Sequence, residues 1–136
     1  KGLGGGLPIG ATLFSEKLKD ALVPGTHGST FGANPVVCAG ALTVVNRIDD
    51  KMLTEITEKG DYIKSELIKL PKVKSISGKG LMLGIEIEGD VKEAITRCME
   101  NGVLVLSAKN KLRLLPPLNI SKNELTKAIK ILKSSI

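Results

Sequence analysis

The sequence has few aromatic side chains and few cysteines. Its 136 residues contain no Trp, one Tyr, two Phe and two Cys. A core cannot be built on large rings, so it must consist of Leu, Ile, Val and Met, which the 42% hydrophobic content supplies. The two cysteines, Cys38 and Cys98, are too few for a disulfide framework or a structural zinc site. We therefore expect reduced, buried thiols and no metal.

Long apolar runs and runs of like charge are also missing. No stretch of about 18 apolar residues occurs, which argues against a membrane-spanning helix, and no signal peptide is visible. The net charge of +6 comes from lysines that are mixed with Asp and Glu. Scattered charge with 2% aromatics offers few stacking platforms for nucleic acid. We expect a cytoplasmic protein that binds neither nucleic acid nor membrane, with a small basic nucleic-acid binder as an alternative.

The pattern of apolar residues predicts a mixed α and β fold. Helices are expected over residues 15–23, 35–70 with a break near 49–50, 91–101 and 121–136. Strands are expected over residues 72–76, 81–88, 103–108 and 111–117, and the glycine-rich start should be a loop that enters a strand or hairpin. The first two of these four strands, joined by Gly78-Lys79-Gly80, should form a hairpin. This order indicates a short, mostly antiparallel sheet covered by helices.

The first segment that could carry chemistry is KGLGGGLPIGA, residues 1–11. It fits neither the P-loop pattern nor the dinucleotide fingerprint, because Leu7 stands where the third glycine of that fingerprint should be. Glycines lack a Cβ, so a planar ligand or a lysine side chain can lie close to the main chain. The alternative is a flexible loop without a ligand.

The second segment is HGSTFGANP, residues 27–35. Ser29 and Thr30 stand between glycines shortly before a helix that Asn34 should cap and Pro35 should begin. Hydroxyl and free N–H groups in such a loop can bind a phosphate. The alternative is a surface loop that ends in a helix cap, in which His27 is an ordinary turn residue.

The third candidate is Arg113, which lies inside the apolar stretch LRLLPP. An arginine in such a strand is either a solvated charge on a sheet edge or is held by a carboxylate. Considered alone, Arg113 is better explained as a solvated edge charge. Glu86 and Glu88 alternate with Ile85 and Ile87, which is typical of a solvated strand face.

Together these segments resemble the class III pyridoxal-phosphate (PLP) aminotransferases. The shared patterns are a lysine with a Gly-rich stretch and P-I-G-A, H-G-S-T-F-G-x-N-P, G-x-G-L-M-x-G-x-E, G-V-L-V and L-R-L-x-P-P-L, at residues 1–11, 27–35, 78–86, 102–106 and 112–118. They occur in the family's order and rough spacing along the whole chain. Within the class the sequence is most similar to acetylornithine aminotransferases.

The resemblance implies an α/β fold, the C-terminal part of a PLP-dependent transferase of fold type I that consists mainly of an α+β small domain. Residues 1–45 would be the end of the large PLP-binding domain with a linking helix, and residues 46–136 the small C-terminal domain. Lys1 matches the lysine that forms the Schiff base with PLP and moves the proton. Thr30, assisted by Ser29, matches the contact to the PLP phosphate of the partner subunit, which implies a homodimer with a shared active site. Arg113 matches a substrate-binding arginine near the substrate entrance, which in relatives pairs with a glutamate or contacts a substrate carboxylate.

The implied function is transfer of an amino group from N-acetylornithine to 2-oxoglutarate in arginine biosynthesis. Ornithine, succinylornithine and 4-aminobutyrate aminotransferases are the alternatives within the class. The chain lacks an initiator Met and opens on Lys1, so we expect it to be a piece of a longer protein. In relatives the aspartate beside the pyridine nitrogen, the stacking aromatic and the first phosphate loop precede this lysine. We therefore expect the piece alone to be inactive, and a folding and dimerisation module is the alternative of another class.

Overall fold

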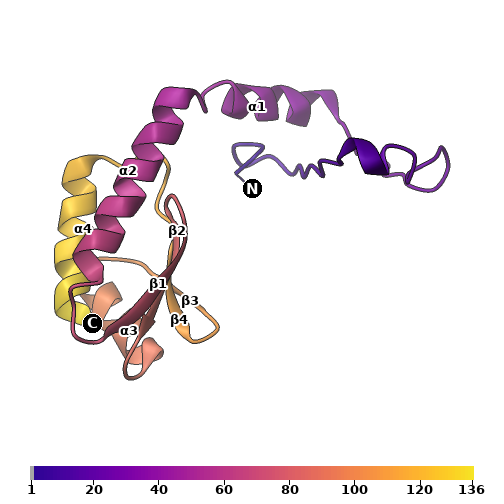
Figure 1. Ribbon diagram of the computed structural model, residues 1–136. Coiled ribbons are helices and arrows are strands. Elements are labelled where there is room, and N and C mark those ends of the chain that lie inside the picture. The colour runs from indigo at the N-terminus through magenta and orange to yellow at the C-terminus, as the bar shows by residue number, and fades with distance from the viewer. Residues whose placement is uncertain (1) are drawn as a thin grey trace. The chain divides into compact units, whose positions relative to one another are not determined.

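The computed structural model describes residues 2–136, and the chain divides into two compact units between Asp49 and Asp50 (Figure 1). Each unit is described by itself. The sequence predicted a boundary slightly earlier, between residues 45 and 46. The assignment of the first unit to a large PLP-binding domain stays a prediction.

The first unit contains little regular structure before its single long helix. The predicted helix over residues 15–23 is wrong, because only a 3-10 turn, η1 (Glu16–Leu18), forms there and Ser15 makes no side-chain cap bond. Leu18 and Leu22 remain about half exposed, at 51% and 49%. A segment this short needs tertiary packing on its apolar face to stay helical. The strand expected after the glycine-rich start is also absent from residues 8–14.

Helix α1 (Pro35–Val45) begins where the sequence predicted. The side chain of Asn34 accepts a hydrogen bond from the Val36 N–H at 3.0 Å, and Pro35 occupies the first turn. Pro35 has no N–H, but this loses no helical hydrogen bond, because the N–H groups of the first turn have no partner within the helix. The predicted break is confirmed, since helix α2 (Asp50–Leu67) begins after a short connection.

The second unit is built on a four-stranded antiparallel sheet with the order β1-β2-β4-β3. The strands are β1 (Val73–Lys79), β2 (Met82–Ile87), β3 (Leu106–Ala108) and β4 (Lys111–Leu114). The predicted hairpin is confirmed, and the mostly antiparallel sheet is the architecture expected from the sequence. The third strand is shorter than predicted, because residues 103–105 lie outside the ladder.

One face of this sheet is covered by α2, α3 (Val91–Glu100) and α4 (Lys122–Ser135), and α2 lies beside α4 (Figure 1). The buried residues of the shared core are aliphatic apart from one cysteine: Ile63, Leu67, Val73, Leu81, Leu83, Ile85, Ile87, Ala94, Cys98, Val105, Leu112, Leu114, Leu125, Ile129, Leu132 and Ile136. The predicted capping box of the last helix is confirmed by reciprocal bonds between Ser121 and Glu124. A self-contained core therefore holds this unit together.

Among the residues that the structure describes, no helix is both long and apolar enough to span a membrane. The same residues contain no cluster of His, Cys, Asp or Glu that could hold a metal ion. Cys38 and Cys98 are both free thiols, with Cys98 buried and Cys38 partly buried.

Candidate functional site

Lys1, the predicted catalytic lysine, lies outside the described residues. The glycine-rich loop that follows it is a tight turn in which Leu7 N–H donates to the Gly4 carbonyl at 3.1 Å. A Cβ on Gly4 would collide with the Leu7 carbonyl oxygen, and Gly5 and Gly6 have positive φ angles of 60° and 105°. These glycines are therefore needed for the turn itself, because L-residues with a Cβ rarely adopt such angles.

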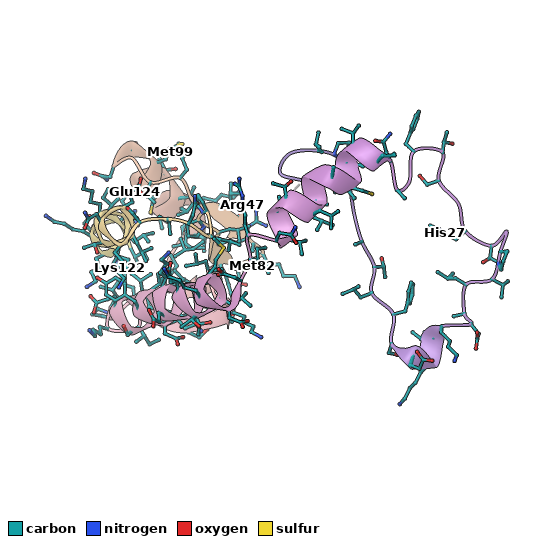
Figure 2. The ribbon with its side chains drawn as sticks, turned by 90° about the horizontal axis from the view of Figure 1, so that it is seen from above. His27, Arg47, Met82, Met99, Lys122 and Glu124 are labelled. Atoms are coloured by element: carbon teal, nitrogen blue, oxygen red, sulfur yellow. The ribbon has the colours of Figure 1, made fainter. Side chains whose placement is uncertain are left out.

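Ser29 and Thr30 lie in an exposed turn four to five residues before Asn34, the cap of α1. The turn is closed by the Gly32 N–H, which donates to the Ser29 carbonyl at 3.3 Å. His27 lies in the loop before this turn, where the chain runs clear of α1 (Figure 2). Within the described residues neither hydroxyl makes a hydrogen bond to another group.

These donors fit the phosphate of PLP. The main-chain N–H of Thr30 donates no hydrogen bond within the described residues, and both hydroxyl side chains are exposed. A phosphate takes up several donors at once, and N–H groups in a turn of this kind form a concave anion site. Ser29 and Thr30 are both exposed, so a phosphate can reach these donors.

Arg113 lies at the middle of the second unit's sheet. Its strand β4 runs between β2 and β3, and Arg113 pairs with Gly84 on one side and Leu106 on the other. The expectation of a solvated edge charge is therefore wrong. Its neighbours Leu112 and Leu114 point into the core, so Arg113 projects from the face that the helices leave open.

The guanidinium of Arg113 lacks the partner that its burial calls for. Its Nε atom is buried and has no hydrogen-bond partner, and no described carboxylate forms an ion pair with this side chain. The sequence allowed a second explanation, in which a carboxylate of this chain holds Arg113. No carboxylate among the described residues does so. A buried donor without a partner costs free energy, so the Nε of Arg113 is an unfavourable feature of this unit taken by itself.

A polar network beside Arg113 was missed by the sequence analysis. Glu86 accepts a hydrogen bond from Ser75 at 2.8 Å and lies 3.5 Å from the ammonium group of Lys111. The bond from Ser75, with the charge of Lys111, lowers the pKa of Glu86 below its usual value. Glu86 is thus occupied by its own neighbours and does not serve Arg113. The alternation of residues could not reveal this, because the contact depends on the register between strands.

The open face also carries exposed apolar side chains. Met82 and Leu106 lie on it and are each 60% exposed, and Leu106 is the cross-strand neighbour of Arg113. An arginine among apolar groups is partly removed from water, which strengthens its attraction for a carboxylate. The face therefore combines one arginine with exposed apolar side chains.

Comparison with known proteins decides the family. The model of the aminotransferase class-III family matches residues 1–136, which is the whole chain. The chain belongs to the class III aminotransferases. The acetylornithine aminotransferase of Haemophilus ducreyi is 49% identical over 134 residues, with 97% of this chain and 34% of that protein covered. That of Clostridium acetobutylicum is 43% identical over 143 residues, with 100% of this chain and 37% of that protein covered.

The fold agrees with solved class III structures. The chain is similar to the ornithine aminotransferase of Toxoplasma gondii, with a TM-score of 0.73 and 32% identity over 88% of this chain and 30% of that one. That structure is described as having partial occupancy of PLP at its active site. The chain spans about a third of the length of the curated relatives it matches. It is therefore comparable with one part of a class III aminotransferase.

Proposed function

We propose that this chain serves an enzyme that transfers an amino group from N-acetylornithine to 2-oxoglutarate with PLP, in arginine biosynthesis. The observation that carries the proposal is the 49% and 43% identity to two acetylornithine aminotransferases over nearly the whole chain. The match to the second of these proteins covers 100% of the chain, and so includes all three segments with candidate site residues. We expect the enzyme to work in the cytoplasm.

Lys1 would hold the cofactor through its amine and move a proton between the substrate carbon and the cofactor. When bound, PLP supplies an electron sink for the carbon that loses its proton. The turn from Gly4 to Gly6 follows shortly after the lysine. Among its glycines, Gly6 has open space where a Cβ would stand, so a flat ring could approach the main chain there.

Ser29 and Thr30 would bind the phosphate through their hydroxyls and the N–H of Thr30. Because both residues are exposed in their own unit, we propose that the phosphate belongs to a partner subunit of a homodimer. Each active site would then take residues from two chains, and a monomer would lack part of its cofactor site.

Arg113 would bind a carboxylate of the amino-acid substrate or of 2-oxoglutarate. The buried Nε without a partner supports this role, because a carboxylate can accept two parallel bonds from a guanidinium. A ligand of this kind would satisfy the buried donor that the unit itself leaves open.

Borohydride reduction of the full-length enzyme loaded with PLP tests the central assignment. Reduction fixes the cofactor to its lysine, so peptide mapping should find the label on Lys1. A label on another lysine would refute the assignment of Lys1. Values of kcat/KM for N-acetylornithine, ornithine, succinylornithine and 4-aminobutyrate then decide among the substrates, and we expect N-acetylornithine to have the highest.

A second candidate function is an association module without activity of its own. Two observations favour it. The second unit has a self-contained core, and the chain spans only about a third of the length of its relatives. We expect the 136-residue chain mixed with PLP to show no transaminase activity. Activity of the isolated chain would refute this candidate.

A further inference from the structure

Lys111 and Arg113 are two cations on the same face of strand β4. They are separated by one residue, so both project from the face that the helices leave open. Their Cα atoms are about 7 Å apart, since each residue of a strand advances the chain by about 3.4 Å. A carboxylate that approaches this face therefore meets two positive side chains, and only Arg113 has a role in the proposed function.

Glu86 supplies a negative charge to one of these two cations. Among the described strand residues of this face it is the only acid, and its carboxylate lies 3.5 Å from the ammonium group of Lys111. The pairing of β2 with β4 places Glu86 opposite Lys111, whereas Gly84 stands opposite Arg113. The register thus gives Lys111 a counter-charge and gives Arg113 none, in agreement with the buried Nε that lacks a partner.

A second contact draws Lys111 away from Arg113. Its ammonium group donates to the Ser77 hydroxyl at 3.3 Å, and Ser77 belongs to β1. Strand β2 lies between β1 and β4, so the side chain crosses β2 at Gly84, where a Cβ would lie 3.4 Å from the Cδ of Lys111. Ser77, Gly84 and Arg113 are aligned across the three strands. Strands are about 4.8 Å apart, so Ser77 and Arg113 are separated by about 10 Å.

We propose that Glu86 is a positioning residue that keeps Lys111 from binding the substrate carboxylate, so that Arg113 alone receives it. The inference rests on the proposed function, because it takes Arg113 as the residue that binds this carboxylate. Either cation attracts a carboxylate, but Lys111 would hold it at a different point along β4. A misplacement of about 1 Å can cost about 100-fold in rate, so a complex with Lys111 is unreactive.

The test uses the full-length enzyme with the change Glu86→Gln. The new side chain has the same shape and can still accept the hydrogen bond from Ser75, so we expect the protein to fold. The matched control is Glu88→Gln. Glu88 is exposed, follows the same strand and forms no ion pair within the described residues. Urea denaturation checks that both variants are folded.

Single turnovers give the measurement. Enzyme that already carries the amino group is mixed with 2-oxoglutarate, and the maximal rate and the half-saturating concentration are determined. In Glu86→Gln the freed Lys111 competes for the carboxylate. We expect both quantities to fall by the same factor, at least about twofold, because two equal charges attract a carboxylate about equally.

Their ratio should stay at the wild-type value. The unreactive complex withdraws enzyme at saturation, but it withdraws none at low substrate concentration. Loss of a merely structural residue would instead lower this ratio. The double variant Glu86→Gln/Lys111→Met should restore both quantities to the wild-type values, because the competing cation is then absent.

Four results would overturn the inference. They are a lower ratio in Glu86→Gln, an unchanged half-saturating concentration, an equal effect of Glu88→Gln, and a double variant that still differs from the wild type. Arg113→Met in the same assay distinguishes this inference from the proposed function. If Arg113→Met leaves the half-saturating concentration unchanged, the role of Arg113 fails and this inference fails with it. If Arg113→Met raises that concentration while Glu86→Gln has no effect, only the role of Glu86 fails.

Discussion

Gly60 of α2 packs directly against the main chain of Gly80, in the turn between β1 and β2. A Cβ on Gly60 would collide with the Gly80 carbonyl oxygen. Gly80 itself has a positive φ of 54°, and a Cβ there would approach Ile56 to 2.7 Å. The close approach of helix and turn therefore depends on two residues without side chains, one on each side.

Substitution of Gly60 by Ala should destabilise the protein. In an isolated helix the change would stabilise by about 1 kcal/mol, but here the new methyl group meets a backbone atom that cannot move alone. We expect a net loss of about 1–3 kcal/mol in the free energy of unfolding, measured by urea denaturation. Gly84→Ala is the control, because its Cβ would lie 3.4 Å from the flexible Lys111 side chain. An equal effect of the two changes would contradict this account.

Glu66 should make stability depend on pH in the acid range. Hydrogen bonds from Lys133 of α4 and from Lys69 lower the pKa of Glu66 from 4.5 to about 2. The folded state thus binds this proton less readily than the unfolded state, so the contribution is complete above about pH 4.5 and is lost as pH falls toward 2.

The variant Glu66→Gln lacks this contribution. We expect it to unfold at higher pH than the wild type during acid titration followed by circular dichroism, and the difference in stability to vanish near pH 2. Glu93→Gln is the control, because Glu93 pairs only with Arg97 on its own helix, at 3.6 Å. A titration curve for Glu66→Gln that matches the wild type would show that the link between α2 and α4 does not matter.

Thr30→Val should weaken PLP binding in the full-length enzyme. The change keeps the shape of the side chain and removes one hydroxyl donor to a charged group, which corresponds to about tenfold in the dissociation constant. The control is Thr26→Val in the same loop, whose hydroxyl already donates to the Val23 carbonyl at 2.7 Å. Equal PLP dissociation constants for Thr30→Val and the wild type, measured by absorbance titration, would count against the phosphate role.

Arg113→Met should lower the activity of the full-length enzyme and leave its stability nearly unchanged. Loss of a charge-assisted contact to a substrate carboxylate should lower kcat/KM about 10- to 100-fold in steady-state assays. Stability should stay within about 1 kcal/mol of the wild type, because the change removes a buried donor that has no partner in the unit. The control Lys111→Met removes a charge from the same face and should change KM little. A large loss of stability in Arg113→Met would assign it a structural role.

Several features of the structure could be predicted from short stretches of the sequence. Asn34 followed by Pro35 specified the start of α1, and Ser121 with Glu124 specified the start of α4, because a helix cap is formed by residues within one turn. The hairpin of β1 and β2 likewise follows from alternation around a glycine turn. The family was visible for a similar reason, since each shared pattern is a short contiguous stretch.

Contacts between distant residues were decided only by the tertiary structure. Nothing near Arg113 in the sequence indicates that its strand lies between two others, because strand order is set by how the chain crosses the sheet. The sequence likewise gives no sign that Gly60 packs against Gly80. Nor does it indicate that Lys133 bonds to Glu66, 67 positions away. The helix predicted over residues 15–23 was wrong for the converse reason, since local propensity was present but the described residues leave the apolar side chains of this segment exposed.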